Sequence, residues 1–202
     1  MHGSRWSLRG FVTPDRAIVT GYDGALREPP AFLVLKLLNF FLDLCLLRRA
    51  PQDLPASQSL LVVVLIVNAL AGIVLGIQTW EGAGMALAAT VLDIGVLLGL
   101  LWVALQVRGV TPRFTQSATA LLGAGTLFTL LAMPLQPLLD TPEEIEAGAL
   151  LYLLLLIWVQ LVYGHVLRHA LNLNLVAGVA LSLVYTFTSA VLIELFFPLP
   201  AS

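Results

Sequence analysis

Charged residues are scarce in this chain, and their scarcity decides the solvent in which it folds. Only 11% of the 202 residues are Asp, Glu, Lys or Arg, whereas soluble globular domains carry about 25%. Hydrophobic residues account for 59% of the sequence, and the mean hydropathy is +0.95. Such a chain cannot cover itself with a polar surface, so the sequence indicates an integral membrane protein whose main partner is the lipid bilayer. No nucleic-acid partner is expected.

Cysteine and lysine are nearly absent. Cys45 is the single cysteine, so no internal disulfide can form and the fold does not depend on an oxidising compartment. Residues 1–30 lack the apolar stretch of a cleavable signal peptide, and we expect them to form a cytoplasmic tail. Nine arginines against one lysine, in a chain rich in Leu, Ala and Val, are typical of a bacterial genome of high GC content. The expected location is therefore a bacterial inner membrane.

Long apolar runs dominate the rest of the sequence. A helix needs roughly 20 mostly apolar residues to cross the hydrocarbon core, and the chain has five such runs separated by short polar breaks. Because backbone groups find no water in the core, runs of this length must be helical, and the alternating pattern of a membrane barrel is absent. The predicted fold is an all-α polytopic bundle of five transmembrane helices within residues 57–202. The spans are predicted at residues 57–79, 83–107, 118–136, 147–167 and 174–197.

Segment 31–49 is shorter and more polar than the five runs. Lys36, Asn39 and Asp43 recur at helical spacing, so they share one face of a helix. That polar stripe favours an amphipathic helix lying in the cytoplasmic interface, with a re-entrant or spanning helix as the alternative. Residues 50–56 contain two prolines and are predicted to form a linker.

Basic residues predict the orientation of the bundle. With five spans, all ten Lys and Arg residues fall on one side, while the opposite loops are acidic. Basic loops face the cytoplasm, so we expect a cytoplasmic N-terminus and an external C-terminus. Tyr152 and Tyr163 are expected to anchor the fourth span in the headgroup regions. The acidic residues of the opposite loops are Glu81, Asp140, Glu143, Glu144 and Glu146.

Asp93 is a carboxylate deep inside a predicted span. The loop between the first two spans is tight, so an antiparallel hairpin places Asn68 and Asp93 at about the same depth. Gly72 and Gly76 follow Asn68 at intervals of four, which predicts a helix-packing face of small residues. We therefore predict an intramembrane polar pair of Asn68 and Asp93, with Asp93 protonated because the membrane core disfavours its charged form.

Three interpretations stay open for the polar and small residues of the spans. The first is packing, in which polar groups hydrogen-bond between helices. The second is a homodimer or partner interface at Gly95 and Gly99, on a face of the second span turned away from Asp93. The third is a substrate or proton path. Its lining would be Asn68, Asp93, Thr126, Gln160 and Thr186.

Catalytic and metal-binding motifs are weak in this sequence. His165 and His169 have the spacing of two zinc ligands on one helix face, but Val166 stands where a zinc protease needs glutamate. A metal site would have to recruit Asp43 or Cys45, so the two histidines are only a weak candidate. We expect no cofactor and no enzymatic activity.

A polar cytoplasmic tail, five closely spaced spans with short loops and an external C-terminus resemble the Yip1-domain family. The resemblance covers residues from about 50 to the end and concerns topology. Here APQDLP stands where eukaryotic members carry a DLYGP-like stretch before the first span. The resemblance implies a non-enzymatic role as a membrane scaffold or partner-recruiting factor. The alternative function is a small proton-coupled transporter or channel that uses Asp93 at the bilayer midplane.

Overall fold

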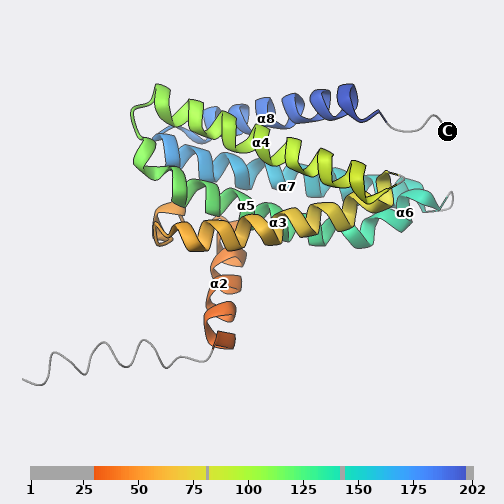
Figure 1. The fold of residues 1–202 in the computed structure, drawn as a ribbon, viewed down its shortest axis with the longest axis horizontal. Helices are drawn as coiled ribbons and strands as arrows, with labels where there is room; N and C mark the ends of the chain where they lie inside the picture. Colours follow the sequence, from red (N-terminus) through yellow and green to blue (C-terminus); the bar gives the residue numbers. More distant parts are fainter. Residues whose placement is uncertain (1–29, 81, 142–143, 199–202) are drawn as a thin grey trace, which may run out of the picture. The chain divides into compact units, whose positions relative to one another are not determined.

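A computed structural model describes residues 30–80, 82–141 and 144–198, and the regular secondary structure of this part of the chain is all helical, with no strand. Figure 1 shows the arrangement of its helices. The longer elements are α2 (Pro30–Cys45), α3 (Gln58–Thr79), α4 (Ala83–Val107), α5 (Phe114–Ala132), α7 (Ile145–Leu171) and α8 (Leu175–Phe196). The short ones are η1 (Pro51–Asp53), η2 (Thr111–Arg113), η3 (Met133–Leu135) and α6 (Gln136–Asp140).

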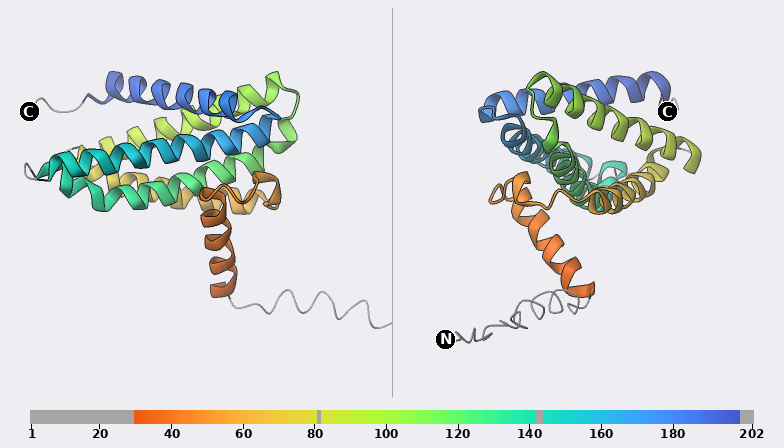
Figure 2. Two further views of the ribbon diagram at one scale, coloured as in Figure 1. Left: turned by 180° about the vertical axis from the view of Figure 1, so that it is seen from behind. Right: turned by 60° about the vertical axis from the view of Figure 1, so that its left-hand side comes forward.

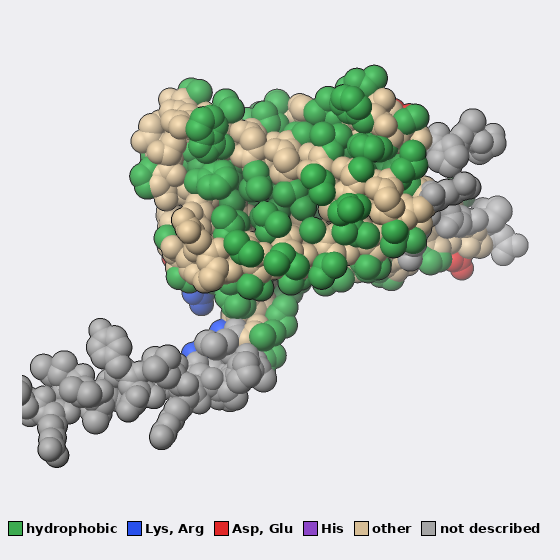
Figure 3. All heavy atoms as spheres, viewed as in Figure 1, with side chains coloured by type: hydrophobic (Ala, Val, Ile, Leu, Met, Phe, Trp, Pro, Cys, Tyr) green, Lys and Arg blue, Asp and Glu red, His purple; other side chains and the backbone are tan. Residues whose placement is uncertain are grey.

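Five stretches are long and apolar enough to cross a membrane, which confirms the predicted fold class. Their hydrophobic side chains are exposed over the face of the bundle seen in Figure 3. In water this surface would be strongly unfavourable, whereas in lipid it needs no cover. The chain is thus a multi-pass membrane protein. The five stretches are Gln58–Ile77, Ala83–Val107, Thr111–Leu139, Ile145–Leu171 and Leu175–Phe196.

The observed helix boundaries agree best with the predicted ones where the polar segment between two spans is short. α4 has the predicted bounds, 83–107, and α3 and α8 differ from theirs by a residue or two. The third span differs more, because helical structure begins earlier and continues past Pro134 and Pro137. Each proline lies in the first turn of a new short helix, where its missing N–H costs no hydrogen bond.

The five long helices form a closed ring in which α3 packs on α4, α4 on α8, α8 on α7, α7 on α5, and α5 on α3. Figures 1 and 2 show α4 and α8 together on one side, with α3, α5 and α7 on the other. α5 is the most enclosed member, because 56% of its most apolar window is buried, against 17–28% in the others. Small residues along α5, including Ala118, Gly123 and Ala124, let its neighbours approach closely.

In two helical hairpins the paired helices pack closely at glycine positions. In the α3–α4 hairpin a Cβ added at Gly72 would lie 2.9 Å from the Thr90 side chain, and one at Gly76 would lie 3.0 Å from Ala86. This is the depth register predicted from the sequence. In the α7–α8 hairpin, a Cβ at Gly164 would lie 2.8 Å from the backbone nitrogen of Val179. At Gly164 the neighbouring atom is backbone and cannot turn away, so a side chain there would separate the helices.

The end of α2 and the segment after it pack against the bundle. Phe41, Leu44 and Cys45 are buried, and the Trp158 indole of α7 donates a hydrogen bond to the Cys45 carbonyl at 2.9 Å. Burial raises the pKa of the Cys45 thiol to about 11, so this thiol stays protonated and unreactive near neutral pH. The helix ends at Cys45, before the predicted residue 49. Its location in the membrane interface stays a prediction.

The predicted linker, residues 50–56, is tied to the bundle by hydrogen bonds from glutamine side chains. Gln52 donates to the His169 carbonyl at 3.0 Å, and Gln116 of α5 donates to the Leu54 carbonyl at 2.7 Å. Ser57 then caps α3 by accepting a hydrogen bond from the backbone N–H of Leu60. The linker thus covers one end of α5 and α7.

Candidate functional site

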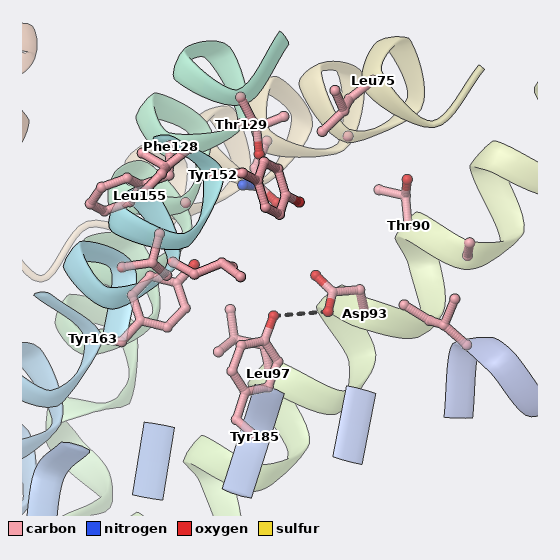
Figure 4. Close-up of a pocket in the computed structure, with 18 of the residues that line it drawn as sticks. Leu75, Thr90, Asp93, Leu97, Phe128, Thr129, Tyr152, Leu155, Tyr163 and Tyr185 are labelled. Atoms are coloured by element: carbon pink, nitrogen blue, oxygen red, sulfur yellow. Dashed lines mark hydrogen bonds between the residues drawn. The ribbon is translucent and has the colours of Figure 1, made fainter. Parts of the chain in front are cut away.

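A partly open cavity of about 280 Å³ lies inside the ring of helices, in the half that contains the α3–α4 turn. Its volume is close to the lower limit of the about 300–1,000 Å³ that is typical of ligand pockets. All five long helices contribute side chains (Figure 4). Its polar and aromatic residues are Asn68, Trp80, Thr90, Asp93, Phe128, Thr129, Tyr152, Tyr163 and Tyr185.

Asp93 of α4 is held by two hydroxyl groups of α8. The Tyr185 hydroxyl donates a hydrogen bond to Asp93 Oδ1 at 2.8 Å, and the Ser189 hydroxyl donates to the same oxygen. Figure 4 shows the other carboxylate oxygen of Asp93 pointing into the cavity. Tyr185 and Ser189 are four residues apart and so share one face of α8. The arrangement fixes the carboxylate while leaving one oxygen available to a proton or a ligand.

Asn68 and Asp93, predicted to form a polar pair, both line the cavity, but they hydrogen-bond to different helices. Asn68 donates to the Leu122 carbonyl at 3.1 Å and to the Thr126 hydroxyl at 3.3 Å, both on α5. The hairpin register gives the depth of a residue but not its direction around the helix axis. Asn68 and Gly72 lie one turn apart on the same side of α3. The Asn68 side chain reaches α5, whereas a Cβ at Gly72 would meet Thr90 of α4.

Thr126, Gln160 and Thr186, predicted as a possible polar lining, are not among the residues that line this cavity. Gln160 of α7 donates to the Thr186 hydroxyl of α8 at 2.7 Å and accepts from Ser182 at 2.8 Å. Thr126 donates to the Leu122 carbonyl of its own helix at 2.9 Å. These three residues therefore act as polar contacts within and between helices.

Tyrosines are the residues that sequence reasoning missed. Tyr152 and Tyr163 were expected as membrane-interface anchors, but both side chains face the cavity, and Tyr163 is buried. Its ring lies 5.9 Å from the ring of Tyr185, measured between centroids. The i, i+4 spacing of Tyr185 and Ser189 was a usable signal for a polar face on α8. Nothing local shows that this face meets Asp93, 92 residues earlier.

Leucines close the cavity toward the end of the bundle that carries Arg108, Arg113 and Arg168. Beyond Leu97 and Tyr185 lies a separate space of only about 10 Å³, roughly enough for one water molecule at most. It is bounded by Leu97, Leu100, Leu101, Leu121, Tyr163, Leu167, Leu181 and Tyr185. Leu97, Tyr163 and Tyr185 line both this space and the cavity.

The two histidines on α7 make contacts that explain them without a metal ion. The rings of His165 and His169 lie 4.7 Å apart, and His165 Nε2 is 3.0 Å from the Arg49 carbonyl oxygen. Within residues 30–80, 82–141 and 144–198, no group of three His, Cys, Asp or Glu side chains is close enough to hold a metal.

Gly95 and Gly99 lie on the exposed face of α4, turned away from the cavity. A Cβ added at either glycine would meet no atom within 4 Å. This face is open to lipid or to another protein, and no second copy is needed to explain the rest of the fold.

No protein-family model matches the chain, and neither a curated protein nor a solved structure is significantly similar to it.

Proposed function

We propose that this protein is a small, non-enzymatic proton-coupled transporter whose central group is Asp93. The observation that carries the proposal is the carboxylate at the edge of a 280 Å³ cavity, with one oxygen fixed by α8 and the other directed into the cavity. Ionisable residues inside membranes are costly, and they mark ion or substrate pathways by default. A purely structural carboxyl group would be better placed in a packed interface, as Gln160 is.

Protonation of Asp93 would be sensitive to what occupies the cavity. The titratable groups that face it are Tyr185 of α8 and Tyr163 and Tyr152 of α7, and no Lys, Arg or His lines the described cavity. A deprotonated Asp93 therefore has no positive partner among the described residues that line the cavity. A cation that enters the cavity would supply such a partner.

Infrared titration of the purified protein tests this function. Because Asp93 exchanges a proton in the proposed cycle, its carboxyl C=O band should change in intensity when the pH is varied. Asp93→Asn identifies the band by its absence, and Asp43→Asn serves as a control outside the spans. A band from Asp93 that is constant over the whole range, or never present, would rule out a proton-carrying role.

A scaffold of the Yip1-domain type is the second candidate. The exposed glycines of α4 favour it, because Gly84, Gly95 and Gly99 all face open space. Faces of small residues allow transmembrane helices to approach one another closely. On this alternative the protein recruits a membrane partner or a second copy through α4, and Asp93 only holds α4 against α8.

A further inference from the structure

The charge of the cavity restricts the ligand it can hold. Asp93 is the one carboxylate among the described lining residues, and no basic side chain offsets it. An anion would meet no positive group and few free donors, since the Tyr185 hydroxyl and the Asn68 amide already donate to protein oxygens. A positively charged ligand would instead supply the partner that the carboxylate lacks.

Aromatic rings form much of the wall around Asp93. Figure 4 shows Tyr152, Tyr163 and Phe128 with Asp93 and Tyr185 around one space. Trp80, at the end of α3, also lines it, and its indole is anchored to α8 by a hydrogen bond to the Phe197 carbonyl at 3.3 Å. Faces of Trp, Tyr and Phe attract cations, and such rings are used to bind quaternary ammonium groups.

The remaining lining selects against a metal ion and against a strongly hydrated ligand. Leu75, Leu97, Leu155 and Ile193 supply apolar surface between the aromatic rings. A metal cation would need several oxygen ligands at short distance, and a sugar would need many hydrogen-bonding partners. An alkylated ammonium group buries its carbon atoms against leucines and rings while its charge faces the carboxylate.

We propose that the cavity binds a small organic ammonium ion, with Asp93 as its counter-ion and the aromatic side chains as its walls. The cavity volume of about 280 Å³ limits the ligand to a small molecule or to a single headgroup. This inference deepens the proposed function and rests on the same cavity, but it does not require transport. Ligand and proton compete for the same carboxylate.

Binding of radiolabelled choline to the purified full-length protein in a maltoside detergent tests the inference. The matched competitor is 3,3-dimethylbutan-1-ol, in which carbon replaces the charged nitrogen with almost no change in shape. We expect choline to displace the label at least tenfold more effectively than this neutral alcohol. Equal displacement by both compounds, or no specific binding of choline, would overturn the inference.

Variants locate the bound ammonium ion. Asp93→Asn should weaken choline binding at least tenfold. Tyr152→Leu should also weaken it, while Tyr152→Phe, which keeps the ring, should bind nearly as the wild type does. Trp102→Leu is the control, because Trp102 is exposed on the outside of α4 and is 51% accessible. Choline binding that is unchanged in both Asp93→Asn and Tyr152→Leu would place the ligand elsewhere and contradict the proposal.

Two further comparisons identify the source of the ligand and test the ammonium site independently of proton coupling. Displacement of choline by a short-chain phosphatidylcholine below its micellar concentration would identify the ammonium as a lipid headgroup, and failure to displace it would indicate a free amine; both support the ammonium site. Choline binding by a protein whose Asp93 never titrates would support the site and remove the proton coupling. A titrating Asp93 without choline binding would remove the ammonium site and keep the coupling.

Discussion

Gly178→Ala is expected to destabilise the protein more than any other single methyl group added to a glycine between the long helices. A Cβ at residue 178 would press into the Gly164 carbonyl oxygen and would lie 3.1 Å from the Gly164 carbonyl carbon and 3.2 Å from the Arg168 nitrogen. All three atoms are backbone, so no side chain can turn away, and α8 must move off α7. Overpacking of this kind typically costs about 1–3 kcal/mol, or several degrees in the unfolding midpoint.

Gly95→Ala is the matched control for this prediction. Both glycines lie within helices, but a Cβ at Gly95 meets nothing within 4 Å. Alanine is a better helix former than glycine by about 1 kcal/mol, so the control should be neutral or slightly stabilising. The unfolding midpoint of each variant is measured in detergent. Samples are heated to a series of temperatures, and size-exclusion chromatography then gives the fraction that stays folded. Equal midpoints for the two would mean that α7 and α8 do not cross at Gly164 and Gly178.

Asp93→Asn is expected to separate folding from function. Asparagine keeps an oxygen that accepts hydrogen bonds from Tyr185 and Ser189, so the variant should be made and purified in normal amounts. It cannot lose a proton or balance a cation. In vesicles with an acidic interior, uptake of radiolabelled choline should therefore fall at least tenfold relative to the wild type. Choline has no neutral form that leaks through lipid, so empty vesicles give a low background.

Asp93→Leu, unlike Asp93→Asn, is expected to affect folding as well as function. It leaves the hydroxyls of Tyr185 and Ser189 without their acceptor, and a lost hydrogen bond in a membrane costs on average about 0.6 kcal/mol. We expect this variant to be less stable as well as inactive. If Asp93→Asn instead behaved as the wild type in every assay while Asp93→Leu lost stability, Asp93 would be structural and the scaffold function would be favoured.

Much of the fold followed from the sequence, because apolar runs and polar breaks determine the length of a transmembrane helix. The bounds of α4 and the register of Gly72 and Gly76 against α4 needed only this pattern and a tight turn. The packed linker at residues 50–56 did not follow, because its hydrogen bonds are donated by glutamines to backbone carbonyls of distant segments. Any carbonyl can accept such a bond, so the sequence carries no mark of the partner.

The site was predicted in part. Asp93 and Asn68 stood out because polar residues inside apolar runs are costly, and both line the cavity. Their partners could not be predicted, since a helix can rotate about its axis without changing the depth of its residues. Tyr152 and Tyr163 looked like interface anchors because tyrosine suits both a headgroup region and an aromatic cavity wall. Only the packing of the five helices into a ring shows that these two tyrosines line the cavity.

The exchange of a bound cation for the Asp93 proton is the most direct test of the central claim. At a pH where the Asp93 carboxyl band is present, addition of saturating choline to the wild-type protein should abolish the band and release about one proton per protein molecule, detected with a pH-sensitive dye. The Asp93→Asn protein should show neither change. Choline binding that leaves the carboxyl band intact and releases no proton would contradict this mechanism.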